Sequence, residues 1–309
     1  MSTVQERVQS ISNNKDLNLN TPYTTAKIEL TGICTLKCNF CYNKIMKDKH
    51  IRQKNMNLSD LCFVIDKLKE IPTLKEVGLF YMGESGLNYN IITGYRLLKS
   101  AGYFTYLTTN ATNIKYIKLA IPYIDSLKVS WNYKNEQDFI TKTNTDVSMY
   151  SKIIENIETL YEICHQNNKE LTISTVLDSD EKEYNEVLKS LKFDHHYFIP
   201  LQTQGGTNIN GYDGVVGESK KPSNPIPCWS LFKGIYIDVN LNVRTCCYGH
   251  QDKHIIGNLK NSSLLDLINS KKVIDMKKKH LNNEIPIECL KCLKNQMLLD
   301  KNKIDHNCH

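Results

Sequence analysis

The sequence lacks any long hydrophobic run. No apolar stretch approaches the roughly 20 residues that a membrane-spanning helix needs, and the opening residues MSTVQERVQSISNN lack the apolar segment of a secretory signal. We therefore expect a cytoplasmic protein that has no membrane partner.

The chain also lacks a strong excess of charge of either sign. It has 39 Lys and Arg against 33 Asp and Glu, a net charge of +6, and its lysines are spread out apart from the short run Lys277-Lys278-Lys279. Such a run is usually a solvated helix face, so a nucleic-acid partner is not expected.

Internal repeats and low-complexity tracts are absent as well. The 309 residues, of which 40% are hydrophobic and 23% charged, suffice for two domains or for one large domain with an appendage. Between residues 26 and 200, short β-branched and aromatic runs alternate with longer helical patterns, which is typical of repeated βα units and a parallel sheet. The expected strands are 26–31, 76–81, 103–108, 126–130, 171–177 and 197–200, and the clearest helices are 58–71 and 151–167.

The character of the sequence changes after Pro200. Residues 204–227 contain five Gly, three Pro and little periodicity, so we interpret them as a linker or a substrate-facing loop. Beyond them, residues 234–239 and 242–246 predict a β-hairpin, and 264–269 and 273–281 predict helices. The expected organisation is therefore an N-terminal extension (1–22), an α/β unit (23–203), the linker (204–227) and a small cysteine-rich α+β unit (228–309).

Cysteine is the residue that the chain has in excess. Nine of the eleven cysteines fall into two groups, one near the N-terminus and one in the last third. Clustered thiols in a reducing compartment indicate metal binding or catalysis. The other two, Cys62 and Cys164, lie within helical patterns, and we interpret them as small core residues.

The first group forms a C-x3-C-x2-C array, Cys34, Cys38 and Cys41, on the loop after the first expected strand. Three thiolates on one loop can ligate three irons of a [4Fe–4S] cluster and leave the fourth iron open to an outside ligand. A zinc site is the alternative, and it would need a further ligand, for which His50 is the only local candidate.

This loop resembles the hallmark motif of the radical S-adenosylmethionine (radical SAM) superfamily, including the aromatic Phe40 before the third cysteine. The resemblance implies a partial (β/α)6 TIM-like barrel, a [4Fe–4S] cluster whose open iron binds S-adenosylmethionine, and an electron donor of the flavodoxin or ferredoxin type. It also implies reductive cleavage of S-adenosylmethionine to a 5′-deoxyadenosyl radical, which takes a hydrogen atom from the substrate.

The resemblance extends to the ends of further expected strands. Met82-Gly83-Glu84 resembles the family's GGE motif, in which Gly83 and Glu84 would hold the methionyl ammonium group, although Met82 stands where Gly is commoner. Asn110 and Ser130 lie at positions from which family members contact the ribose and carboxylate of the cofactor. A turn role for Asn110 and a strand-end cap for Ser130 are the alternatives.

The second group supplies four thiolates from one lone cysteine, one hairpin cysteine and one C-x2-C knuckle: Cys228, Cys246, Cys289 and Cys292. Four thiolates make a closed site, which fits structural zinc as well as an iron–sulfur cluster. Behind a radical SAM motif, the segment resembles the SPASM and shorter Twitch domains, which carry auxiliary [4Fe–4S] clusters. Leu298 stands where a full SPASM domain has its next cysteine, so one auxiliary cluster is expected, with Cys308 as an alternative ligand.

Cys247 directly follows Cys246 and, on a continuing strand, would point to the opposite face. Radical epimerases with this architecture return a hydrogen atom to the substrate radical from a thiol. The resemblance therefore makes Cys247 a candidate catalytic donor, and the alternative is a packed thiol.

The arrangement as a whole resembles small radical SAM enzymes of natural product biosynthesis, the aminocyclitol dehydrogenases and aminoglycoside epimerases. It implies an oxidoreductase or epimerase that acts on a small sugar- or aminocyclitol-like substrate. Two alternatives stay open: epimerisation or cross-linking of a ribosomally made peptide, and a non-catalytic iron–sulfur electron-transfer or scaffold protein.

Overall fold

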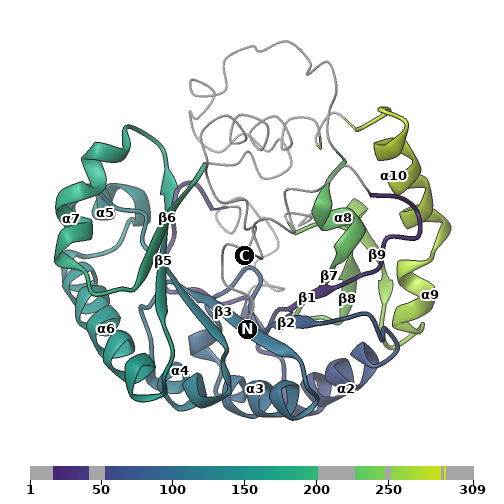
Figure 1. The fold of residues 1–309 in the computed structure, drawn as a ribbon, viewed down its shortest axis with the longest axis horizontal. Helices are drawn as coiled ribbons and strands as arrows, with labels where there is room; N and C mark the ends of the chain where they lie inside the picture. Colours follow the sequence, from purple (N-terminus) through teal and green to yellow (C-terminus); the bar gives the residue numbers. More distant parts are fainter. Residues whose placement is uncertain (1–16, 42–52, 201–226, 248–251, 287–288, 290–309) are drawn as a thin grey trace.

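A computed structural model describes residues 17–41, 53–200, 227–247, 252–286 and 289. Its described strands form one curved sheet in the order β6-β5-β4-β3-β2-β1-β7-β8-β9. The sheet curves into an open ring, and helices cover its convex side (Figure 1). This is the expected α/β architecture of a partial barrel followed by a small antiparallel unit.

The barrel part consists of six parallel strands, as the sequence predicts. They are β1 (Thr25–Ile28), β2 (Glu76–Gly78), β3 (Phe104–Thr109), β4 (Ser126–Ser130), β5 (Leu171–Leu177) and β6 (His195–Pro200). The predicted bounds of β4 and β5 are confirmed. The prediction for β2 is three residues too long, because the chain leaves the sheet after Gly78 and runs toward the loop that follows β1.

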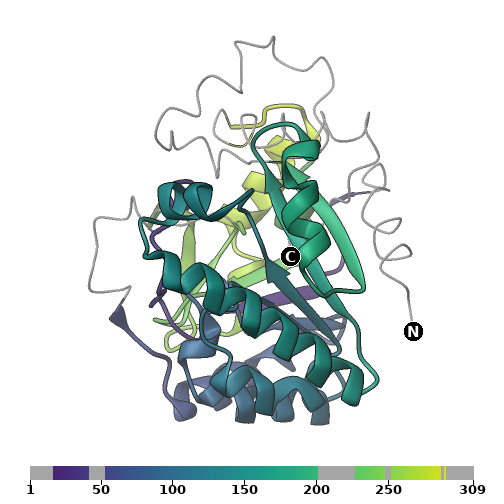
Figure 2. The ribbon, with the colours of Figure 1, turned by 90° about the vertical axis from the view of Figure 1, so that its left-hand side faces the viewer.

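The helices that follow these strands form a layer outside the sheet (Figure 2). They are α2 (Leu58–Leu68), α3 (Asn90–Ser100), α4 (Lys115–Ala120), α5 (Glu136–Thr143), α6 (Val147–Gln166) and α7 (Asn185–Ser190). Alternation along the strands separates two environments: in β4, Leu127 and Val129 belong to the hydrophobic core. The intervening residues Ser126, Lys128 and Ser130 therefore face the concave side of the sheet, where the carboxyl ends of barrel strands form active sites.

The C-terminal unit continues the barrel sheet. Strand β7 (Gly234–Ile237) pairs in parallel with β1, and β8 (Asn242–Arg244) and β9 (Ile255–Asn258) follow in antiparallel pairing. The helices of this unit are α8 (Trp229–Lys233), α9 (Leu264–Ile268) and α10 (Lys271–Leu281). The predicted hairpin and helices are present, but β8 ends at Arg244, two residues before its predicted end. The ladder is irregular between Val243 and Arg244, and the Arg244 side chain is held by Asp238.

Of the two cysteines predicted to lie in the core, only one does. Cys62 is exposed, whereas Cys164 is buried as expected. The buried stripe of α2 is Leu61, Val64, Ile65 and Leu68, and Cys62 lies on the opposite side of the helix.

The prediction that Lys277, Lys278 and Lys279 form a solvated helix face holds for only two of the three residues. Lys277 lies on the buried stripe of α10, with its ammonium 4.2 Å from the ring centre of Tyr23, and burial lowers its pKa to about 8. Lys278 and Lys279 are exposed.

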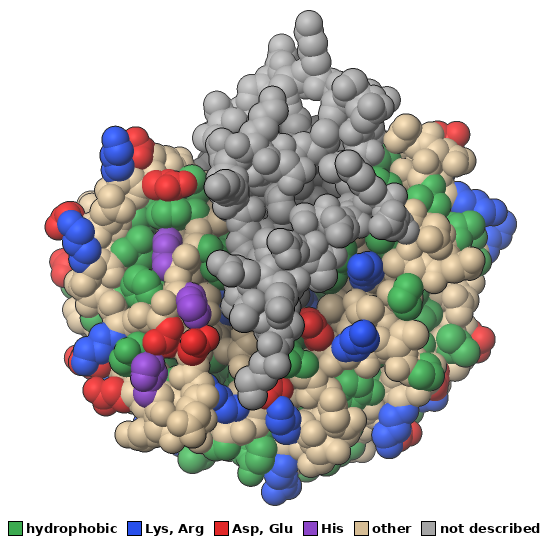
Figure 3. Space-filling view, viewed as in Figure 1, with side chains coloured by type: hydrophobic (Ala, Val, Ile, Leu, Met, Phe, Trp, Pro, Cys, Tyr) green, Lys and Arg blue, Asp and Glu red, His purple; other side chains and the backbone are tan. Residues whose placement is uncertain are grey.

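On the visible face, described basic and acidic side chains are interspersed (Figure 3). Several form exposed ion pairs, such as Lys152 with Glu155. Among the described residues, no helix combines the length and apolar character needed to cross a membrane.

Candidate active site

The cysteine loop lies directly after β1, at the carboxyl end of the barrel strands. Burial, with a smaller contribution from the charge of Glu84, raises the pKa of the Cys34 thiol to about 12. Burial and the neighbouring Cys41 and Cys34 raise the pKa of Cys38 above its ordinary value. The three thiols are half-buried and influence one another electrostatically, and a bound metal's positive charge would favour their thiolate forms. Among the residues that the structure describes, no group of three or more His, Cys, Asp and Glu side chains is arranged to hold a metal ion.

Hydrogen-bond donors lie beside two of these sulfur atoms. The amide nitrogen of Asn110 donates to the Cys34 Sγ at 3.4 Å. The hydroxyl of the fully buried Tyr133 hydrogen-bonds with the Cys38 thiol. Donors of this kind stabilise thiolate ligands, so the surroundings fit an iron–sulfur cluster.

Gly83 lies against the backbone of the cysteine loop. A Cβ atom at this position would lie 2.0 Å from the carbonyl oxygen of Thr31 and 2.8 Å from that of Ile33. The next residue, Glu84, donates its backbone N–H to the Ile33 carbonyl at 2.8 Å. Only glycine allows this approach, which joins the end of β2 to the start of the cysteine loop.

The Glu84 carboxylate joins the ends of β2 and β3. It accepts hydrogen bonds from the Thr109 hydroxyl at 2.6 Å, from the Asn110 backbone N–H at 2.8 Å and from the Gly86 N–H at 3.1 Å. Burial raises the pKa of Glu84, although these three donors oppose the shift. A carboxylate can accept about four hydrogen bonds, so room is left for a further donor.

The predicted cofactor residues are therefore only partly brought together. Gly83, Glu84 and Asn110 converge on the loop that carries Cys34. Ser130 lies at the end of β4 and pairs in register with Ser174 of β5, on a different part of the ring. Phe40 is half-buried on the cysteine loop.

Helix α5, which the sequence did not predict, supports the cysteine loop. The last turn of α5 accepts two hydrogen bonds from that loop: Asn39 N–H donates to the Lys142 carbonyl at 2.7 Å, and Lys37 N–H donates to that of Thr143 at 3.3 Å. Because the last carbonyls of a helix have no partners within it, they are ready acceptors for this loop.

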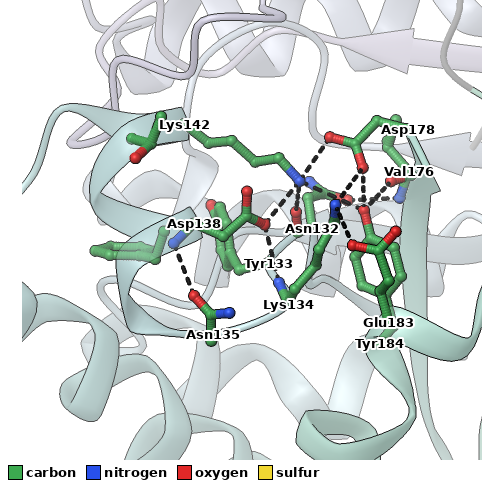
Figure 4. A network of polar contacts seen from close by, with 12 residues as sticks. Asn132, Tyr133, Lys134, Asn135, Asp138, Lys142, Val176, Asp178, Glu183 and Tyr184 are labelled. Atoms are coloured by element: carbon green, nitrogen blue, oxygen red, sulfur yellow. Dashed lines mark hydrogen bonds and ion pairs between the residues drawn. The ribbon is translucent and has the colours of Figure 1, made fainter. Parts of the chain in front are cut away.

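A buried ionic network holds the same turn of α5 to the ends of β4 and β5 (Figure 4). The Lys142 ammonium lies 2.8 Å from the carboxylates of Asp138 and Asp178, and it donates to the Asn132 carbonyl at 2.9 Å. Although burial opposes the shift, hydrogen bonds from Lys142 and Tyr184 hold the pKa of Asp178 below its ordinary value. The sequence around Lys142 does not indicate that its side chain forms this network, because its partners Asn132 and Asp178 follow other strands.

The described cysteines of the C-terminal unit have contacts in two places. Cys228 and Cys289 both pack against Ile285. Cys246 lies beyond β8, where its carbonyl oxygen accepts a hydrogen bond from the Tyr81 hydroxyl at 2.8 Å. Cys292 and Cys308 lie outside the described residues.

Cys247 acts electrostatically on the same tyrosine. Both Cys246 and Cys247 contribute to the raised pKa of Tyr81, after the larger effect of its burial. The Ser230 hydroxyl donates to the Cys247 Sγ at 3.4 Å. Because β8 ends at Arg244, strand alternation does not apply at Cys247, and the direction of its thiol stays a prediction.

Residues 28–191, more than half of the chain, match the family model described as the radical SAM superfamily. The chain belongs to the radical SAM superfamily. Residues 228–293 match the model of the SPASM iron–sulfur cluster-binding domain. No curated protein sequence matches the chain.

Solved structures of radical SAM enzymes share the fold at low sequence identity. The structure is similar to SuiB of Streptococcus suis bound to its precursor peptide SuiA (TM-score 0.63, 14% identity, 88% of this chain and 69% of that chain). It is also similar to anSMEcpe with bound AdoMet and a Cp18Cys peptide (0.60, 15%, 88% and 88%). BtrN in complex with AdoMet and 2-DOIA is a third (0.55, 13%, 93% and 93%).

Membership of the superfamily establishes the cofactors. This radical SAM enzyme uses a [4Fe–4S] cluster and S-adenosylmethionine, and its SPASM domain binds auxiliary iron–sulfur clusters.

Replacing Glu84 tests its assignment to the methionyl ammonium. In the Glu84→Gln variant we expect S-adenosylmethionine affinity to fall about ten- to a hundredfold, because a charge-assisted hydrogen bond contributes roughly 1.5–3 kcal/mol. The iron content should stay unchanged, since Glu84 is not a ligand. Equilibrium binding and iron analysis of the reconstituted protein measure both, with Glu76→Gln at the other end of β2 as the control. Equal affinities of Glu84→Gln and the parent protein would remove Glu84 from the binding site.

Proposed function

We propose that the three thiolates of the C-x3-C-x2-C loop bind the cluster that cleaves S-adenosylmethionine. The ligands are Cys34, Cys38 and Cys41. Gly83 and Glu84 hold the methionyl ammonium, and Phe40, Asn110 and Ser130 complete the cofactor site. The donor positions of Asn110 and Tyr133 beside the sulfur atoms support this assignment. A flavodoxin- or ferredoxin-type protein supplies the electron.

The C-terminal unit, residues 228–309, holds one closed auxiliary cluster. Its ligands are Cys228, Cys246, Cys289 and Cys292. The packing of Cys228 and Cys289 on one side chain, Ile285, supports a common site. Residues 23–203 form the barrel and 204–227 the connection between the two units.

The reaction is epimerisation or dehydrogenation of a small sugar- or aminocyclitol-like molecule. The observation that supports this most is the polar row on the concave side of the sheet, where Ser130, Ser174 and Tyr197 lie in register on three neighbouring strands. Hydroxyl groups in a row suit a substrate that is itself rich in hydroxyl and amino groups. The cofactor supplies a 5′-deoxyadenosyl radical, which takes one hydrogen atom from a substrate carbon.

Cys247 distinguishes the two outcomes. In epimerisation its S–H bond breaks, and the hydrogen atom forms a C–H bond on the other face of the substrate radical. The resulting thiyl radical needs one electron and one proton to regenerate the thiol, and an auxiliary cluster held by Cys228, Cys246, Cys289 and Cys292 would supply that electron. In dehydrogenation the substrate radical instead loses one proton to solvent and one electron, which the auxiliary cluster would accept. The electrostatic effect of Cys247 on Tyr81, one residue before the Met82-Gly83-Glu84 segment, supports a thiol close to the cofactor site.

Peptide modification is the second candidate, because SuiB and anSMEcpe share this fold and bind peptides in their structures. Reconstituted protein, S-adenosylmethionine and dithionite, incubated in D2O with a panel of aminocyclitols and amino sugars and with a peptide panel, separate the possibilities. Deuterium at one inverted carbon identifies epimerisation, and a product lacking two hydrogens identifies dehydrogenation. Turnover of peptides alone would overturn the small-molecule assignment.

A further inference from the structure

Two residues that adjoin Cys228 each carry a buried N–H group without an acceptor. Within the described part of the chain, Nε2 of His280 and Nε1 of Trp229 are buried and have no hydrogen-bond partner. Proteins leave few buried donors unpaired, because such a group loses its hydrogen bonds to water and gains none in return. Two of them next to one cysteine need a common explanation.

His280 is fixed as a donor at Nε2 by its other ring nitrogen. The residue lies on the buried stripe of α10 with 1% of its surface exposed. Its Nδ1 accepts a hydrogen bond from the Cys228 backbone N–H at 3.3 Å. A neutral imidazole that accepts at Nδ1 carries its hydrogen at Nε2, so the unpartnered atom is an N–H group.

The two donors adjoin the proposed auxiliary ligands. Trp229 directly follows Cys228 and begins α8. Cys228 and Cys289 pack against Ile285, five residues after His280. His280 and Trp229 therefore both adjoin Cys228, which shares the contact with Ile285 with Cys289, and both thiols would carry negative charge when bound to iron. A cluster has sulfide and thiolate sulfur atoms on all its sides, and these accept hydrogen bonds.

We propose that His280, through Nε2–H, and Trp229, through Nε1–H, donate hydrogen bonds to sulfur atoms of the auxiliary iron–sulfur cluster and raise its reduction potential. This rests on the ligand set given above. Reduction adds negative charge to the cluster, and a donor aimed at sulfur stabilises the more negative state. A higher potential makes the cluster a better acceptor of an electron from a substrate radical.

The test is a redox titration followed by electron paramagnetic resonance in the Cys34/Cys38/Cys41→Ala background, where the auxiliary cluster is the remaining one. In His280→Asn, the side-chain oxygen takes the place of Nδ1 and still accepts from Cys228, but no donor reaches the position of Nε2. We expect the reduced-to-oxidised ratio at a fixed potential to fall about tenfold, a shift of about 59 mV for a one-electron couple. His280→Gln, whose amide reaches that position, should stay closer to the parent.

Trp229→Phe keeps a ring and removes the indole N–H, and its potential should shift in the same direction. His196→Asn is the control and should cause no shift, because His196 is a half-buried histidine on β6 that hydrogen-bonds with Thr175. Unchanged potentials in His280→Asn and Trp229→Phe, with four irons retained, would overturn the inference and leave the proposed ligand set intact. Loss of those irons in His280→Asn, with circular dichroism unchanged, would make His280 a ligand and also overturn it. Absence of iron from the background protein itself would contradict both the ligand set and the inference.

Discussion

The Cys34/Cys38/Cys41→Ala protein is expected to retain about four of the eight irons that two [4Fe–4S] clusters give the parent, and to cleave no S-adenosylmethionine. In the proposed site, three thiolates would leave one iron open for the cofactor. Without them neither the cluster nor the cofactor is held. Iron and sulfide analysis after anaerobic reconstitution and chromatography of 5′-deoxyadenosine measure the two effects.

Cys62→Ala is the matched control, because Cys62 is an exposed cysteine of the barrel and its loss should change neither quantity. An intact protein with four irons and stoichiometric zinc would contradict the auxiliary iron–sulfur cluster. Continued formation of 5′-deoxyadenosine by the triple variant would contradict the ligand assignment.

The Cys247→Ala protein is expected to hold both clusters and to form 5′-deoxyadenosine, but to yield no inverted product. A carbon radical takes a hydrogen atom readily from a thiol, and alanine offers none. The substrate radical should then accumulate or leave as an oxidised species. Product analysis in D2O, together with iron content, measures this result.

Ser230→Ala provides the control for this experiment. It removes the hydroxyl that donates to the Cys247 thiol and keeps the thiol itself, so inversion should continue. If Cys247→Ala instead forms the same product at the parental rate, Cys247 is a packed thiol and dehydrogenation becomes the leading reaction.

The sequence by itself determined the features that depend on local pattern. The period of the apolar residues predicted the parallel strands, with β4 and β5 at their observed bounds. The spacing of Cys34, Cys38 and Cys41 indicated the family, because ligands to one cluster must lie on one short loop. Gly83-Glu84 could be recognised from the residue types alone, because only glycine permits the close contact with the Thr31 carbonyl.

The tertiary structure decided what depends on segments far apart in the chain. Lys142 supports the cysteine loop only because folding brings Asp178 and Asn132 to the same turn of α5. The direction of the Cys247 side chain could be predicted by alternation only if β8 continued to that residue. The structure ends the strand at Arg244, so the alternation of side chains no longer applies. In the sequence, nothing distinguishes His280 from other residues of its helix. Its meeting with Cys228, 52 positions away, is a property of packing alone, because contacts between distant segments leave no periodic trace in either one.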